Sequence, residues 1–270
     1  MRFLRFPVIL SLFVFAHANA FAADDGIFVD RSQYANRQLL PDFTAAACTA
    51  TILRDEIKRR FGVPVKYVVF THGHADHISG GQIFQDDGAL VVANQRALEP
   101  IIGEKIPTAV PDRIFDKDMT ISLGGETVLL HRVASSHSDS MIMVLFPGYK
   151  ALQCTDACES KSMPYNDFLD FYYDGWIETL DWVVQQDVDV IDVGHYSPAT
   201  KADEAALRAY LVDLHQQVLD LVRSGQLWDQ LYRKVRFSDE VRKWTAFDTM
   251  HTLNVLGMYR WVTNHRRGEW

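Results

Sequence analysis

The stretch Thr71-His72-Gly73-His74-Ala75-Asp76-His77 crowds four potential metal ligands into one short segment. It closes residues 65–71 (VKYVVFT), a run of β-branched and aromatic residues that predicts a buried strand. Because alternate side chains of a strand share a face, His72 and His74 can converge on one ion, and Asp76 and His77, past the turn, can reach a second. Imidazole and carboxylate ligands suit zinc, and also iron or manganese. Packing does not explain this density of histidines, and the stretch therefore predicts a metal site.

Three more metal-capable residues stand beside predicted strands farther along the chain. His137 precedes the apolar run at 141–146, Asp156 follows the strand predicted at 150–153, and His195 follows the strand predicted at 188–193. Each alone is weak evidence, because a lone histidine is usually an ordinary polar residue.

The HxHxDH pattern, with these three residues in this order, resembles the signature of the metallo-β-lactamase superfamily, whose fold is shared by glyoxalase II. The resemblance runs from about Gly26 to Gly225. It implies an α/β fold, a four-layer αββα sandwich, and a site for a pair of zinc ions. The implied ligands are His72, His74 and His137 for one metal and Asp76, His77 and His195 for the other, with Asp156 bridging them.

The same resemblance implies a hydrolase whose metal-bridging hydroxide cleaves an ester, thioester, lactone or amide bond in a small molecule. Asp76 is the candidate catalytic residue, because a free carboxylate oxygen there would orient the hydroxide and shuttle its proton. Two other activities on this fold stay open, a β-lactamase acting on lactam antibiotics and an iron-dependent oxidoreductase of the sulfur dioxygenase kind. A metal-binding protein without catalysis is a further alternative, and the full set of ligands argues against it.

The sequence departs from the family's pattern at both ends of this region. Only a short segment precedes the strand predicted at 27–29, so the N-terminal strands of the sandwich are expected to be reduced. Asp30 is followed by Arg31 rather than by the family's usual glycine. After His195 the chain continues into a predicted helical extension over about residues 200–270, in which Thr200 and Asp203 make a helix-capping pair. The substrate is therefore not identified by the resemblance.

The first residues differ in character from the rest of the chain. Arg2 and Arg5 precede the apolar run 6–16, and Ala18-Asn19-Ala20 fits a cleavage motif, so residues 1–22 are predicted to be a signal peptide. Residues 23–270 would then form one mature hydrolase domain that is periplasmic or secreted, without a membrane span. The net charge of −8 makes nucleic acid an unsuitable partner.

The remaining periodicities predict helices at 42–61, 174–184, 200–223 and 240–263, strands at 65–71 and 89–93, and a hairpin over 119–133. Asp139 is a candidate hydrogen-bond acceptor for a ligand, and Tyr196 is a candidate for reaching the pocket. Cys154 and Cys158 flank Asp156, and a disulfide, free thiols and a cysteine ligand are all open.

Overall fold

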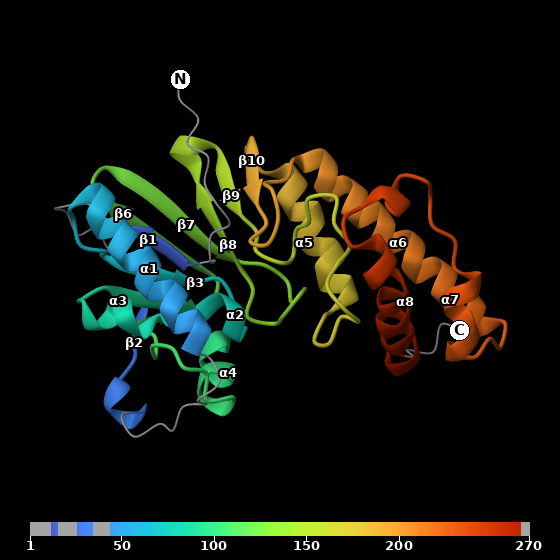
Figure 1. Ribbon diagram of the computed structural model, residues 1–270, viewed down its shortest axis with the longest axis horizontal. Coiled ribbons are helices and arrows are strands. Elements are labelled where there is room, and N and C mark those ends of the chain that lie inside the picture. The colour runs from blue at the N-terminus through green and yellow to red at the C-terminus, as the bar shows by residue number, and fades with distance from the viewer. Residues whose placement is uncertain (1–11, 16–25, 35–43, 266–270) are drawn as a thin grey trace.

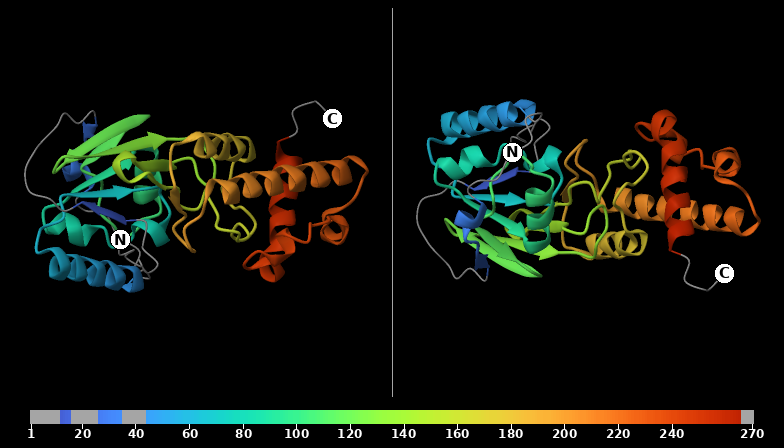
Figure 2. Two further views of the ribbon diagram at one scale, coloured as in Figure 1. Left: turned by 90° about the horizontal axis from the view of Figure 1, so that it is seen from above. Right: turned by 90° about the horizontal axis from the view of Figure 1, so that it is seen from below.

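The computed structural model describes residues 12–15, 26–34 and 44–265, with the side chains of residues 26–33 and 49–265. Two five-stranded sheets face each other at one end of the molecule, and the C-terminal helices extend away from them (Figures 1 and 2). This arrangement is the mixed α/β sandwich that the sequence predicts.

The first sheet has the order β1-β3-β4-β5-β2. Its central strands β3 (Tyr67–Phe70), β4 (Leu90–Asn94) and β5 (Arg113–Phe115) are parallel. The edge strands β1 (Leu12–Phe15) and β2 (Ile27–Phe28) are antiparallel to their neighbours β3 and β5. The carboxyl ends of the central strands therefore meet at one edge of the sheet. The histidine-rich segment follows β3 directly and begins at this edge.

The second sheet has the order β10-β9-β8-β7-β6. Its strands are β6 (Asp118–Leu123), β7 (Glu126–Arg132), β8 (Ile142–Phe146), β9 (Ala151–Gln153) and β10 (Val190–Asp192). β6 and β7 form the predicted hairpin across Gly124-Gly125, and only β9 and β10 are parallel. The segments that follow β9 and β10 consequently leave the sheet side by side.

Helices cover the outer faces of both sheets. The first sheet is covered by α1 (Thr44–Phe61), α2 (Ala75–Ile78), α3 (Gln82–Asp86) and α4 (Leu98–Gly103). Short 3-10 turns elsewhere in the described chain are Arg31–Tyr34, Gln95–Ala97, Pro147–Tyr149 and Val241–Lys243. The second sheet carries α5 (Tyr173–Gln185) and α6 (Lys201–Arg223), followed by α7 (Trp228–Lys234) and α8 (Phe247–Asn264). Four layers in the order αββα result.

Strand β3 shows why its run of apolar residues is continuous. Val68 and Phe70 pack with the helical layer, in the same buried cluster as Phe84 and Ile101. Val69 points the other way and lies in the cluster that joins the two sheets, with Ile142. Because both faces of this strand are covered, every position is apolar.

The helical extension begins as predicted and ends differently. Thr200 caps α6 in a reciprocal capping box with Asp203. The last helix was expected from residue 240, but α8 begins at Phe247. Ala246 adopts a left-handed backbone (φ 63°), which an α-helix does not accommodate, so the chain before it forms a separate 3-10 turn. The apolar periodicity continues through this break, so the pattern does not predict where α8 begins.

The N-terminal segment differs in part from expectation. Leu12–Phe15, inside the predicted signal peptide, forms β1 beside β3. The cleavage motif at 18–20 lies outside the described residues, and the signal peptide stays a prediction. None of the helices in the described part of the chain has both the length and the apolarity needed to cross a bilayer.

A pair of buried carboxyl groups lies between α6 and the segment after β9. The side chain of Glu204 accepts a hydrogen bond from the backbone N–H of Glu159 (3.3 Å), and its Oε1 has no hydrogen-bond partner. Burial raises the pKa of Glu204 to about 9 and raises that of Glu159 well above its usual value. Folding therefore keeps a proton on Glu204 at neutral pH.

Replacement of this acid should change how stability depends on pH. Because the folded pKa is raised, the contribution of Glu204 is complete below the ordinary pKa of 4.5 and is lost as pH rises through about 9. Glu204→Gln should thus show a smaller fall in Tm between about pH 6 and pH 9 than the unaltered protein. Glu178→Gln, on an exposed position of α5, is the matched control. An identical fall in all three proteins would contradict the expectation.

Candidate metal centre

The candidate ligands meet at one edge of the sandwich because four chain segments turn there. The segment 72–77 leaves β3, and the N–H of Ile142 at the start of β8 donates to the carbonyl of Thr71 (2.9 Å), which ties the two sheets together. The N–H of Asp156 donates to the carbonyl of Val193 (3.1 Å), so the segments after β9 and β10 run together. Residues more than 100 positions apart in the chain thus share one site.

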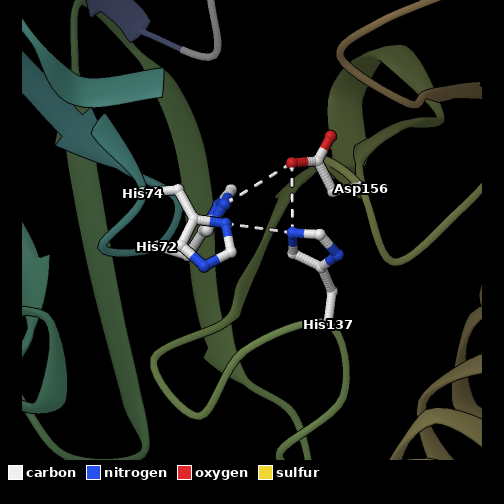
Figure 3. A group of neighbouring side chains, drawn as sticks. All are labelled: His72, His74, His137 and Asp156. Atoms are coloured by element: carbon white, nitrogen blue, oxygen red, sulfur yellow. Dashed lines mark hydrogen bonds and ion pairs between the residues drawn. The ribbon is translucent and has the colours of Figure 1, made fainter. Parts of the chain in front are cut away.

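The first group of side chains consists of His72, His74, His137 and Asp156, shown in Figure 3. The Nε2 atom of His137 lies 3.0 Å from Nδ1 of His74. The Nε2 atoms of His72 and His137 each lie 3.5 Å from Oδ2 of Asp156. The potential ligand atoms all fall within 4.8 Å of one another, which is close enough to surround one ion.

The second group consists of Asp76, His77 and His195. The Nε2 atoms of His77 and His195 are 3.1 Å apart, and they lie 3.1 Å and 3.5 Å from Oδ2 of Asp76. Asp156 also contacts this group, with Oδ2 2.6 Å from His77 and Oδ1 3.3 Å from His195. One carboxylate therefore touches imidazoles of both groups.

The buried atoms at the centre of the cluster fit metal ions. His72 is fully buried, yet its Nε2 makes no hydrogen bond, and neither does Oδ1 of Asp156, which has only the 3.3 Å contact with His195 described above. A buried polar atom without a partner costs about 1–3 kcal/mol, so these atoms need a ligand of another kind. Imidazole nitrogens and a carboxylate oxygen are the donors that a divalent transition metal takes.

The electrostatics of the cluster favour the metal-binding form of its most buried histidine. Burial, together with the positive charge that His77, His74 and His137 can carry, lowers the pKa of His72 well below its usual value. A neutral imidazole has the free lone pair that coordination requires. Burial would raise the pKa of Asp76, but hydrogen bonds with His195 and His77 outweigh it and hold that pKa well below its usual range.

The sequence profile of the metallo-β-lactamase superfamily matches residues 46–195, which is more than half of the chain. The chain belongs to the metallo-β-lactamase superfamily. The match covers the segments that carry all seven candidate ligands, from His72 to His195. The described fold agrees with this membership.

Individual members of the superfamily are distant. The chain is 24% identical over 215 residues to 2,4-dinitroanisole O-demethylase subunit alpha from Nocardioides sp. (strain JS1661), which covers 77% of this chain and 64% of that protein. A stereoselective inverting sec-alkylsulfatase from Pseudomonas sp. covers 83% of this chain, with 45% of its own length, at 15% identity and a TM-score of 0.61. A metallo-β-lactamase from Pontibacter korlensis covers 60% of this chain and 75% of its own at 21% identity and a TM-score of 0.53.

These likenesses define the fold and not the reaction. The chain spans less than two thirds of the length of the curated relatives it matches. The two similar structures named above are below 25% identity to this chain, and their names indicate different substrates. Function within the superfamily has to be argued from the site itself.

The loop that carries Asp156 is closed by a disulfide between Cys154 and Cys158. Asp156 lies between them with a left-handed backbone (φ 60°), a conformation that aspartate tolerates better than most residues. Both sulfurs are bonded to each other and both cysteines are buried, so neither offers a thiolate to a metal. Of the three possibilities left open by the sequence, the structure thus has the disulfide for this pair.

The sequence missed a carboxylate that contacts the cluster from outside. Oδ2 of Asp170 lies 2.8 Å from Nε2 of His74, the ring nitrogen opposite the one that faces His137. Asp139, the acceptor suggested by sequence, instead pairs with Arg96 (3.6 Å) at the surface. Asp170 lies in the segment between β9 and α5, 96 residues from His74, and no local pattern marks it.

Helix α5 supports the segment that carries His137. Gly175 packs so closely on this segment that an added Cβ would lie 1.8 Å from the carbonyl oxygen of Ser135. The N–H of Tyr172 also donates to the carbonyl of Ser136 (2.8 Å). The ligand segment therefore rests directly on the backbone of the helix.

Gly175→Ala should displace this segment, because the clash involves backbone on both sides. We expect a loss of about 1–3 kcal/mol in the free energy of unfolding, measured by denaturant titration, together with lower metal content. The matched control is Gly103→Ala in α4, where no atom lies within 4 Å of the added Cβ. Equal stability of the two variants would refute the packing argument.

Four histidines of the described residues lie outside the cluster. Each stacks on an aromatic side chain, in the pairs His131–Trp182, His215–Tyr173, His251–Phe247 and His265–Trp261. Tyr196, beside His195, is 45% exposed and lines the cavity next to the cluster.

Proposed function

We propose that this member of the superfamily is a dinuclear zinc hydrolase of an ester, thioester, lactone or amide bond in a small molecule. The observation that supports it most directly is the convergence of two ligand groups on the Asp156 carboxylate, with unpartnered buried donors at the centre. In this proposal His72, His74 and His137 hold one ion, Asp76, His77 and His195 hold the other, and Asp156 contacts both.

The bound ions would lower the pKa of a water between them and polarise the oxygen of the scissile group. Asp76, whose side chain is 64% exposed and lines the cavity, would orient that water and accept its proton. Overall, ester hydrolysis adds the oxygen of water to the acyl carbon and a proton to the leaving alcohol. Protein side chains do not need to form a covalent intermediate.

The test begins with the metal. Protein prepared from the full chain should contain about two zinc ions per molecule by elemental analysis, and a chelator should remove them together with the activity. Activity should be measured against a panel containing an aryl ester, a thioester, a lactone, an anilide and β-lactams. Restoration by zinc of turnover on at least one of them would support the proposal, and a metal-loaded protein without turnover of any would refute it.

The same panel separates the alternative activities. Turnover of β-lactams well above that of simple esters would make the protein a β-lactamase. One tightly bound iron per chain, with oxygen consumption in the presence of a persulfide, would point to an oxidoreductase of the sulfur dioxygenase kind. Two zinc ions per chain would count against that reading.

Export is proposed on the sequence of residues 1–22 alone. It predicts that the protein isolated from its native host begins near residue 23, in the periplasm or outside the cell, with residues 23–270 forming the hydrolase domain. Mass spectrometry of the intact protein measures this directly. A mass that includes residues 12–15 would show instead that the segment of β1 is retained in the mature protein.

A further inference from the structure

A cavity of about 710 Å³ opens beside the ligand cluster, and its walls differ sharply in chemistry. Part of its lining consists of His74, Asp76, His137, Asp156 and His195. Most of the rest comes from residues 163–171 and Trp176 and is mostly apolar, although Asp170 of this segment contacts His74. The volume lies within the range typical of small-molecule sites.

The apolar wall is built in two tiers. Phe168, Phe171 and Trp176 form a buried aromatic group, with ring centroids 4.7 to 5.9 Å apart. Tyr165 and Leu169 also line the cavity, and they are 73% and 77% exposed. Large apolar side chains exposed beside a cavity indicate a surface that an apolar ligand would cover.

The C-terminal helix α8 holds this wall in place. The amide of Asn254, fully buried in α8, donates to the carbonyls of Pro164 (2.9 Å) and Asn166 (2.7 Å), and Tyr210 of α6 donates to its Oδ1 (2.9 Å). Gly257 allows the backbone to approach so closely that an added Cβ would lie 2.2 Å from the carbonyl oxygen of Asp167. The helical extension therefore fixes the shape of the wall.

Apart from the histidines and the ions they would hold, the cavity offers no cationic group. Among the described residues that line it there is no lysine or arginine, and the acidic side chains are Asp76, Asp156, Asp170 and Glu159, of which burial keeps Glu159 towards its neutral form by raising its pKa. An acidic group on the body of a substrate, away from the bond to be cleaved, would lose its hydration here without gaining a cationic partner. Such burial is costly, so the wall selects against it.

We propose that the wall formed by residues 163–171 and Trp176 binds the aryl or alkyl body of an uncharged ester or lactone. The scissile bond would then lie against the His/Asp cluster. This rests on the proposed hydrolase function and adds the substrate class: an apolar body that carries no acidic group. It also assigns the helical extension a role in recognition, through Asn254 and Gly257.

The kinetic test uses the zinc-loaded full chain and two esters of matched length. We expect kcat/KM for 4-nitrophenyl hexanoate to exceed that for the mono-4-nitrophenyl ester of adipic acid, which ends in a carboxylate, by at least about tenfold. Tyr165→Ala/Leu169→Ala should lower kcat/KM about tenfold more for the hexanoate than for 4-nitrophenyl acetate. Leu169→Lys should narrow the gap between hexanoate and adipate.

The matched control is Leu227→Ala/Trp228→Ala, which removes an exposed apolar pair at the start of α7, at the far end of the helical extension (Figure 1). This variant should keep the kinetics of the unaltered protein. Equal kcat/KM for the hexanoate and adipate esters, or equal effects of the two double variants, would overturn the proposal.

Binding separates this inference from the hydrolase function itself. Calorimetry with 2-acetylnaphthalene, an uncharged aryl ketone that is not hydrolysed, should show binding that weakens in Tyr165→Ala/Leu169→Ala and persists in Leu227→Ala/Trp228→Ala. That result without turnover of any ester would support the apolar site and refute the hydrolase. Turnover of an ester, together with unchanged binding of the ketone in Tyr165→Ala/Leu169→Ala, would support the hydrolase function and refute the apolar site.

Discussion

Asp156→Ala should reduce bound metal from about two ions per chain to about one or fewer, and lower kcat/KM by at least about 100-fold. The reason is that this carboxylate contacts His72, His137 and His77 through one oxygen and His195 through the other. Its loss would remove a donor from both ions at once. Mutation of residues that only support ligands already costs about 10–100-fold, and a direct ligand should cost more.

The control for this variant is Asp187→Ala, which removes an exposed aspartate whose partner is Lys150 (2.9 Å). It should keep both metals and full activity. Elemental analysis and titration with a chelating dye measure the metals, and circular dichroism checks that Asp156→Ala is folded. A folded Asp156→Ala protein with an unchanged metal count would show that this carboxylate does not bridge the two ions.

The convergence of the candidate ligands could be predicted because its signals are local. His72, His74, Asp76 and His77 share one segment, and the other three candidates each stand beside a strand that apolar residues reveal. The sandwich follows from the same alternation, as the two faces of β3 illustrate. The sequence pattern and the order of the strands therefore suffice to predict that these residues lie at one edge of the sandwich, and no long-range contact has to be known.

The parts that the sequence missed depend on contacts between distant segments. Short elements such as β5 and α4 have too few residues for a periodic signal. The apolar wall could not be predicted because its aromatic residues resemble core residues in the sequence, and the exposure of Tyr165 and Leu169 beside the cavity is a property of the folded chain. The break before α8 depends on the left-handed backbone of Ala246, a residue with no intrinsic preference for it.

Asp170 is a residue of the site that the sequence did not reveal. After that of Asp156, its removal should have the largest effect on metal binding and kcat/KM. Its carboxylate lies 2.8 Å from Nε2 of His74, where it can accept the ring proton and leave Nδ1 free for a metal. Burial alone would raise the pKa of Asp170, but the hydrogen bond and the charge of His74 hold it below its usual value. An ionised acceptor fixes the ring orientation and makes Nδ1 a stronger donor.

Asp170→Ala should therefore weaken metal binding and lower kcat/KM by about 10–100-fold. Asp170→Asn keeps an acceptor oxygen without the charge, so its metal affinity and kcat/KM should lie between those of Asp170→Ala and those of the unaltered protein. Chelator competition measures the metal affinity independently of turnover. Because the Asp170 side chain is 55% exposed, the variants should fold normally. The matched control is Asp139→Ala, whose aspartate pairs with Arg96 at the surface and should matter little. A larger loss of metal affinity in Asp139→Ala than in Asp170→Ala would identify Asp139 as the supporting carboxylate, because only the residue that orients a ligand changes the affinity of the ion it holds.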